Sequence, residues 1–196
     1  MSEEKFNYEK ILNEAIPFYE KGREGDIQHV KWLYKTIPNF IDDSVDSEIL
    51  MPVALLHDVG YANVPKNSDS YNLDIRKLHS EEGAKIAKNI LEKLNYPNKK
   101  IAEIERLILK HDNWAFGDSF KDEPTLLFFQ NFDFMWMASK EGFEICRKNM
   151  KKEPQEFYEQ IEKFQEANIE RGTKWYNEKI EKYYEQLMGE RKSELK

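Results

Sequence analysis

Four histidines and two aspartates interrupt apolar stretches of the sequence, and residues of these types hold transition-metal ions in proteins. The clearest case is ALLHDVGY, in which His57 and Asp58 follow an apolar run. Neutral imidazole and carboxylate suit Fe, Mn, Zn or Ni, and a carboxylate can bridge two ions where imidazole cannot. Ions held in this way can activate water. The six candidate ligands are His29, His57, Asp58, His79, His111 and Asp133.

Helical spacing turns these side chains toward the protein interior. In SEILMPVALLHD, positions 49, 53 and 57 share a helical face, so His57 lies in line with Ile49 and Val53. Asp58 follows Ala54 in the same way. The other three histidines also fall on apolar stripes: His29 with Trp32 and Leu33, His79 with Gly83, Ile86 and Ile90, and His111 with Ile104 and Ile108.

Asp133 is an aspartate on one of the most apolar helices expected in the chain. Its spacing places it among Leu126, Phe129, Trp136 and Met137. A buried carboxylate without a partner costs several kcal/mol or more, so it is normally paired, hydrogen-bonded or bound to a metal ion. No arginine lies within a helical turn of it on the same helix.

A single histidine on an apolar face is more often a hydrogen-bonded core residue than a metal ligand. Four histidines together with Asp58 and Asp133, one or two per helix, favour a shared site, because packed helices can bring such residues to one point. Asp58 is the natural bridge between two ions, since it is flanked by His57 and central in the order. The doublet also stands at a helix C-terminus, which favours a cation.

The elements that must position these residues are helices. The chain has eight glycines and seven prolines, helix-type apolar spacing almost throughout, and no sustained alternation, which predicts an all-α protein. The segments 61–72 and 113–123 are predicted to be loops. Helices are predicted over residues 5–21, 26–37, 46–59, 74–94, 98–111, 124–139, 142–150, 154–171 and 173–190.

Several residues indicate where these helices begin and end. Asp26 and Asn98 are expected to cap the second and fifth helices, and Pro124 suits the first turn of the sixth. Gly60 is expected to end the third helix by adopting the left-handed conformation. Pro52 lies inside that helix and is expected to kink it or to mark a later start.

Composition limits the partners and the location of the protein. The formal net charge of −7 and the pI of about 5.3 argue against a nucleic-acid duplex or an anionic membrane as main partner. No apolar run approaches the ~20 residues of a membrane span, and MSEEKFNYEK lacks the features of a signal peptide, so a soluble cytoplasmic protein is expected. Cys146 is the only cysteine, so His and carboxylate must hold any metal.

The order His, His-Asp, His, His, Asp on successive helices resembles the HD-domain superfamily of metal-dependent phosphohydrolases. The resemblance is carried by DIQHVKWLY, ALLHDVGY, LHSEEGAKIAKNIL, LILKHD and FDFMWM, and it covers roughly residues 20 to 140. It implies an all-α HD-domain helical bundle with extra C-terminal helices. The ligands that it implies for the metal shared by nearly all such domains are His29, His57, Asp58 and Asp133.

The resemblance also implies a dinuclear site. His79 and His111 match the additional ligands of members that hold two metals, with Asp58 bridging. The expected cofactors are one or two divalent metal ions, Fe or Mn first, with Zn, Ni or Mg as further candidates. The expected substrate is a small phosphorylated molecule, a nucleotide in the first instance.

Catalytic and substrate-binding roles are predicted for residues near this site. Many two-metal relatives carry a lysine where this chain has Tyr61, so Lys66 in the same loop becomes the candidate general acid, beside Asp58 as catalytic carboxylate. Lys66, Arg76 and Lys77 are close enough in sequence to clamp phosphate oxygens. The alternative for all three is solvated surface, where basic residues usually lie.

The loop after His111 is also a candidate for contact with substrate. Trp114 and Phe116 lie in it, and binding residues often sit on loops held by a rigid scaffold. Asp112 is interpreted as a surface residue at a helix end rather than as a residue that orients a ligand.

The implied function is hydrolysis of a phosphoester in a nucleotide or related small metabolite through metal-activated water. Two alternatives stay open. Some HD-type proteins share the ligand order but are di-iron oxygenases that cleave a carbon bond in a small polyol or phosphonate. A metal-containing binding module with little turnover is the other.

Two regions are predicted. Residues 1–150 are expected to form the HD-type domain and residues 151–196 a C-terminal helical extension that packs on it. The expectation that the extension packs on the domain rests on an apolar stripe, which is formed by Tyr176, Ile180, Tyr183 and Leu187. The stripe could instead dock a partner or a second copy of the chain, which would give a homodimer.

Overall fold

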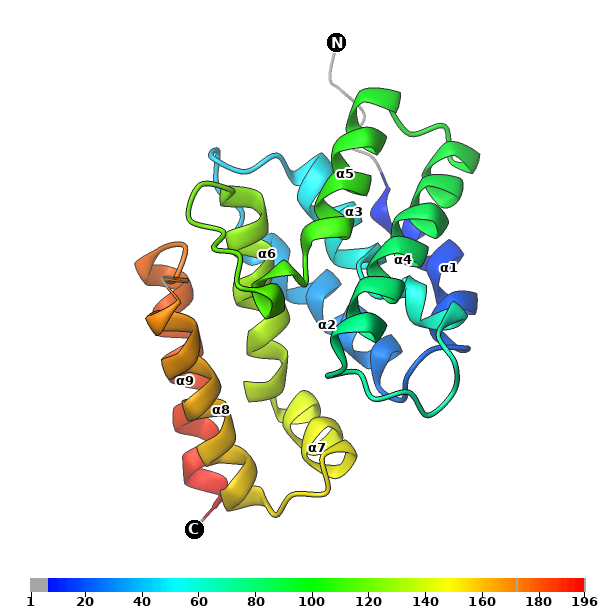
Figure 1. The fold of residues 1–196 in the computed structure, drawn as a ribbon. Helices are drawn as coiled ribbons and strands as arrows, with labels where there is room; N and C mark the ends of the chain where they lie inside the picture. The colour runs from blue at the N-terminus through cyan, green and yellow to red at the C-terminus, as the bar shows by residue number, and fades with distance from the viewer. Residues whose placement is uncertain (1–6, 172, 196) are drawn as a thin grey trace.

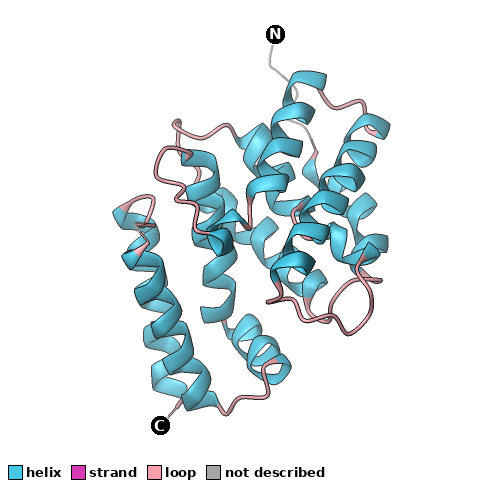
Figure 2. Ribbon diagram, in the orientation of Figure 1, coloured by secondary structure: helices cyan, strands magenta, loops and turns pink. Residues whose placement is uncertain are grey.

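The computed structural model describes residues 7–171 and 173–195 as helices joined by loops, with no strand in that range (Figures 1 and 2). The all-α prediction is confirmed. The α-helices are α1 (Tyr8–Tyr19), α2 (Asp26–Thr36), α3 (Ser47–Leu56), α4 (Leu73–Lys93), α5 (Asn98–Lys110), α6 (Pro124–Met135), α7 (Lys140–Asn149), α8 (Pro154–Glu170) and α9 (Glu178–Glu194). Short 3-10 helices are η1 (Ile37–Asn39), η2 (Val59–Asn63), η3 (Asn113–Phe116) and η4 (Trp136–Ala138).

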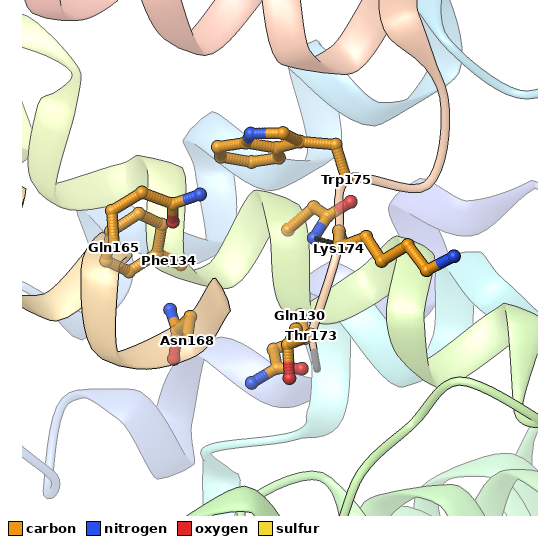
Figure 3. A pocket seen from close by; sticks show the side chains of 8 residues that line it. Gln130, Phe134, Gln165, Asn168, Thr173, Lys174 and Trp175 are labelled. Carbon is orange, nitrogen blue, oxygen red and sulfur yellow. Dashed lines mark hydrogen bonds between the residues drawn. The ribbon is translucent and has the colours of Figure 1, made fainter. Parts of the chain in front are cut away.

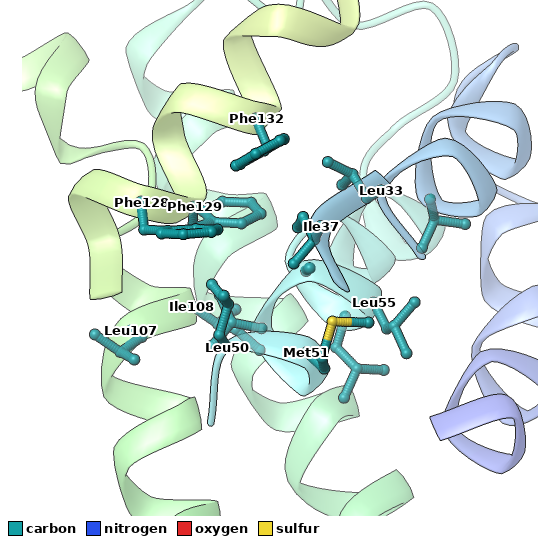
Figure 4. Packing of buried hydrophobic residues seen from close by; sticks show 14 of the residues in the cluster. Leu33, Ile37, Leu50, Met51, Leu55, Leu107, Ile108, Phe128, Phe129 and Phe132 are labelled. Atoms are coloured by element: carbon teal, nitrogen blue, oxygen red, sulfur yellow. The ribbon is translucent and has the colours of Figure 1, made fainter. Parts of the chain in front are cut away.

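Helix α3 lies at the centre of the core. It contacts α1, α2, α5 and α6, and every residue from Leu50 to Leu56 is buried. Figure 4 shows Leu50, Met51 and Leu55 beneath the phenylalanines of α6. A helix that is apolar on all sides is stable only when it is buried on all sides. The doublet at its end is therefore delivered to the middle of the protein.

Pro52 neither ends nor delays α3, which runs from Ser47 to Leu56. A proline inside a helix lacks the N–H that would bond to the carbonyl four residues earlier, here that of Glu48. The hydroxyl of Tyr96 donates to the Glu48 carbonyl oxygen at 2.6 Å instead. A side chain from the segment between α4 and α5 thus supplies the hydrogen bond that Pro52 removes.

This replacement predicts a coupling between Tyr96 and Pro52. Tyr96→Phe should lower the free energy of unfolding by about 1–2 kcal/mol, because a helical carbonyl loses its donor. In a Pro52→Ala background the alanine N–H restores that bond, so the same change should cost less than half as much. Urea denaturation of the four proteins of this double-mutant cycle measures the difference. An equal cost in both backgrounds would show that the hydroxyl does not substitute for the helix bond.

Two predicted caps are wrong in detail. The N-cap of α2 is Gly25, and the Asp26 carboxylate, one residue later, instead accepts hydrogen bonds from the backbone N–H and side chain of Arg23. The N-cap of α5 is Pro97 rather than Asn98, while Pro124 does occupy the first turn of α6. Residues 5 and 6 of the first predicted helix lie outside the described residues.

The last helix begins at Glu178 rather than at residue 173. The N–H of Thr173 donates to the Asn168 carbonyl and closes the end of α8. The following segment docks on α6 through Asn131, whose carboxamide oxygen accepts from Tyr176 N–H at 2.8 Å. These contacts hold residues 173–177 against α8 and α6 before α9 begins.

The C-terminal helices share the apolar core of the chain. Phe157 and Ile161 of α8 and Ile180 of α9 are fully buried in it. The predicted stripe is used here as well, because Tyr176 lies against Phe128 with ring centroids 5.0 Å apart. The division at residue 150 and the homodimer stay predictions. No helix among the described residues has both the length and the apolar character needed to cross a bilayer.

Candidate metal centre

Two groups of side chains in the described part of the chain could each hold a metal ion, and together they contain all six predicted ligands. In each group the three ligand atoms lie within 4.8 Å of one another. The first group is His29 of α2, His57 at the end of α3 and Asp133 of α6. The second is Asp58, His79 of α4 and His111 at the end of α5.

Asp58 joins the two groups. Its Oδ2 lies 3.2 Å from His57 Nε2, and its Oδ1 lies 3.4 Å from His79 Nε2 and 3.7 Å from His111 Nε2. In the first group, Asp133 Oδ1 lies 3.4 Å from the Nε2 of both His29 and His57. One oxygen of Asp58 thus faces each group, as the prediction of a bridging carboxylate requires.

The imidazoles are oriented to offer Nε2 to an ion. The Nδ1 atoms of His57, His79 and His111 lie 3.1, 3.3 and 2.6 Å from backbone carbonyl oxygens three or four residues earlier. A carbonyl can only accept, so Nδ1 carries the proton and a neutral ring has its lone pair on Nε2. The Nε2 atoms of His29 and His57 are buried with no hydrogen-bond partner. Buried nitrogens left in this state indicate that the residues fit a bound metal.

Gly60 brings the doublet against α4, and its predicted left-handed conformation is wrong. The described glycines with positive φ are Gly25 and Gly117, whereas Gly60 lies within η2. A Cβ on Gly60 would stand 1.9 Å from the His79 carbonyl oxygen and 2.5 Å from the Gly83 nitrogen. The missing side chain lets η2 touch the backbone of α4, and this contact sets the distance between Asp58 and His79.

The two histidines of the first group titrate in opposite directions. Burial lowers the pKa of His29 to about 4, with Asp133 opposing the shift. Burial also acts to lower the pKa of His57, but the carboxylates of Asp58 and Asp133 outweigh it and raise the pKa to about 10. In the metal-free protein at pH 7, His29 is therefore neutral and His57 is protonated.

Metal binding should consequently release about one proton from His57 at pH 7, because only the neutral ring can bind an ion. The metal affinity should rise about tenfold per pH unit and level off as the pH passes about 10. Titrating Mn into metal-free protein in weakly buffered solution with a pH indicator measures the protons released per ion. Binding without acidification would contradict the charged state of His57.

Comparison with models of protein families identifies the family of the chain. The family model of the HD domain matches residues 25–127, a little over half of the chain. The chain belongs to the HD domain family. No curated protein and no solved structure matches it. In this HD domain the match ends before Asp133, which only the structure places with His29 and His57.

Arg23 lies two residues before the matched range and was missed by the sequence analysis. Its Nη2 donates to Asp58 Oδ2, and its Nε donates to Asp26 Oδ1 at 3.1 Å. The guanidinium lies over the Tyr61 ring, 3.6 Å from the centroid, and Tyr61 in turn stacks on His79 at 4.2 Å. Burial raises the pKa of Asp58, but Arg23 and His57 outweigh it and hold that pKa well below its usual range.

Asp112 repeats this arrangement on the other side of the site, and its interpretation as a surface residue is wrong. It is 6% exposed, and its Oδ2 lies 2.7 Å from Arg76 Nη1 and 3.7 Å from His79 Nε2. Trp114 Nε1 donates to Asp112 Oδ1 at 3.1 Å. The sequence feature that could have predicted this burial is a second His-Asp doublet, His111 and Asp112. Asp58 and Asp112 have nearly the same backbone angles (φ −103°, ψ 3° and φ −96°, ψ 3°).

The centre opens onto a cleft of about 750 Å³. Four of the six candidate ligands line it, and so do Arg23, Arg76 and Trp114. Lys66 and Lys77 are exposed and do not line the cleft, and Phe116 is 47% exposed and also lies outside its lining. The structure thus brings together the six ligands, Arg76 and Trp114, but does not bring either predicted lysine to them.

Proposed function

We propose that this HD domain is a metal-dependent phosphohydrolase that acts on a phosphoester of a nucleotide or related small metabolite. The observation that carries the proposal is the pair of ligand groups joined by Asp58. These groups open onto a cleft that Arg23 and Arg76 line beside them. Two divalent ions held there, Fe or Mn first, would lower the pKa of water and neutralise phosphate charge. Asp58 would orient both ions, because one of its oxygens faces each group.

Arg23 and Arg76 support an anionic substrate. Each is fixed by a carboxylate and by an aromatic ring, Arg23 by Asp26 and Tyr61, and Arg76 by Asp112 and Trp114. A guanidinium held in place loses little freedom when it donates to a phosphate oxygen. This supports binding of phosphate without the predicted lysines, and it favours an anionic substrate over a neutral polyol.

The rest of the cleft suits the non-phosphate part of such a molecule. Its lining also includes the apolar side chains of Met137, Ile145, Met150 and Phe164. Ligand pockets of about 300–1,000 Å³ hold small molecules and combine apolar walls with a few polar groups. A nucleoside or a similar ring system is of the right size and chemistry for this wall.

The test is phosphate release by protein loaded with Mn, or with Fe(II) in the absence of oxygen, across a panel of nucleotides and sugar phosphates. Wild type should hold about two ions per chain and release phosphate, while His79→Ala should hold about one and lose most activity. Two bound ions without phosphate release from any compound would overturn the proposal. Oxygen consumption by the iron form with a polyol or phosphonate would instead identify an oxygenase, and bound ions with neither activity would indicate a binding module.

A further inference from the structure

Three arginines line the cleft, and one of them is bound differently from the others. Arg23 and Arg76 pair with buried carboxylates. Arg171, at the end of α8, is exposed and makes no ion pair with any described carboxylate. Its guanidinium carbon lies 5.9 Å from the ring centroid of Trp114. Arg171 therefore presents an uncompensated positive charge to the cleft.

Trp114 links Arg171 to the metal centre. Arg76 lies over the same indole ring, 4.8 Å from its centroid, and Asp112 accepts from the indole N–H. Asp112 in turn approaches His79 of the second ligand group. Contacts thus run from Arg171 to the Trp114 ring, from that ring to Asp112, and from Asp112 to the second ligand group.

The backbone that carries Arg171 is held in place. Its N–H donates to the Ala167 carbonyl at 3.2 Å, and Thr173 N–H donates to the Asn168 carbonyl at 2.9 Å. Asn131 of α6 donates to the Lys174 carbonyl at 3.4 Å, next to a small cavity of about 10 Å³ shown in Figure 3. The backbone at the end of α8 is therefore tied to the helix that carries Asp133.

We infer that Arg171 forms a second anion-binding subsite, so that the preferred substrate is a phosphoester that carries a further phosphate or carboxylate. The inference rests on the proposed hydrolase function. The reacting phosphate would face the ligand groups, and the second anion would accept charge-assisted hydrogen bonds from Arg171. Trp114 would pack against the part of the molecule that joins the two. Electrostatic complementarity of this kind selects among substrates and does not accelerate the reaction itself.

Two matched probes test this inference, phenyl phosphate and its para-carboxy derivative. Arg171→Ala should raise the KM about tenfold for para-carboxyphenyl phosphate, as expected for loss of one charge-assisted hydrogen bond, and change it less than about twofold for phenyl phosphate. The kcat for both compounds should change little. Lys163→Ala, which removes an exposed cation of α8 outside the cleft, should leave both compounds unaffected.

A binding measurement separates failure of the inference from failure of the proposed function. The Kd of the non-hydrolysable analogue para-carboxyphenyl phosphonate, measured by calorimetry on metal-loaded protein, should rise about tenfold in Arg171→Ala. If wild type hydrolyses neither phosphate ester, the proposed function fails for these compounds and the Kd comparison alone decides on the subsite. Equal effects of Arg171→Ala on both probes, or no effect on either, would overturn the inference.

Discussion

Replacing Asp58 with asparagine should leave about one metal ion or fewer per chain and lower phosphate release by about 1,000-fold. Asp58 faces both ligand groups. The asparagine amide lacks the negative charge that lets one carboxylate bind two ions. Charge stabilisation by bound ions amounts to several kcal/mol, at about tenfold in rate per 1.4 kcal/mol. Elemental analysis and steady-state kinetics on the same preparations measure both effects.

Asp122→Asn provides the control, because Asp122 is exposed and belongs neither to the cleft lining nor to either ligand group. It should retain both the metal content and the activity of wild type. Circular dichroism should show the same helix content in all three proteins. A fully loaded Asp58→Asn protein would mean that Asp58 does not hold the ions.

Replacing Gly60 with alanine should destabilise the protein by about 3 kcal/mol and disrupt the metal centre as well. The new Cβ would stand 1.9 Å from a carbonyl oxygen in α4, and neither backbone can yield without moving a ligand. For a chain of this size the expected fall in Tm is roughly 6–12 °C. Thermal unfolding of metal-free protein and metal content per chain test the two parts separately.

Gly189→Ala is the matched control, since Gly189 lies within α9 and nothing stands within 4 Å of its added Cβ. That change should raise stability by up to about 1 kcal/mol, because alanine favours helix. Metal content should not respond to it. If both variants unfold at the wild-type temperature, close contact between η2 and α4 does not constrain Gly60.

The helices and the burial of the four histidines could be predicted because both follow from local periodicity. Each histidine shares a face with apolar neighbours, so burial of that face carries the imidazole inward. The helix ends were harder to predict. Pro52 is expected to interrupt α3, but the Tyr96 hydroxyl donates to the Glu48 carbonyl, 48 residues away in the chain, and the helix continues. A hydrogen bond between such distant residues leaves no local trace in the sequence.

The residues around the ligands could not be predicted from proximity in sequence. Arg23 lies in a loop with no periodic neighbours, and only the packing of that loop brings it to Asp58, 35 residues later. Lys66 is closer in sequence to the doublet than Arg23 is, yet it is exposed to solvent. Asp112 follows a helix end, where a surface position is usual, and its burial depends on Arg76 from α4.

The outer wall of the cleft and its metal centre are encoded in separate stretches of the chain. All six candidate ligands precede α7, whereas Ile145, Phe164 and Arg171 line the cleft from α7 and α8. Substitutions in the later stretch can therefore change which molecules fit while the ligands keep their positions. Evolution could change the molecules that such a cleft accepts without rebuilding the candidate metal centre, and an engineer could exploit the same independence.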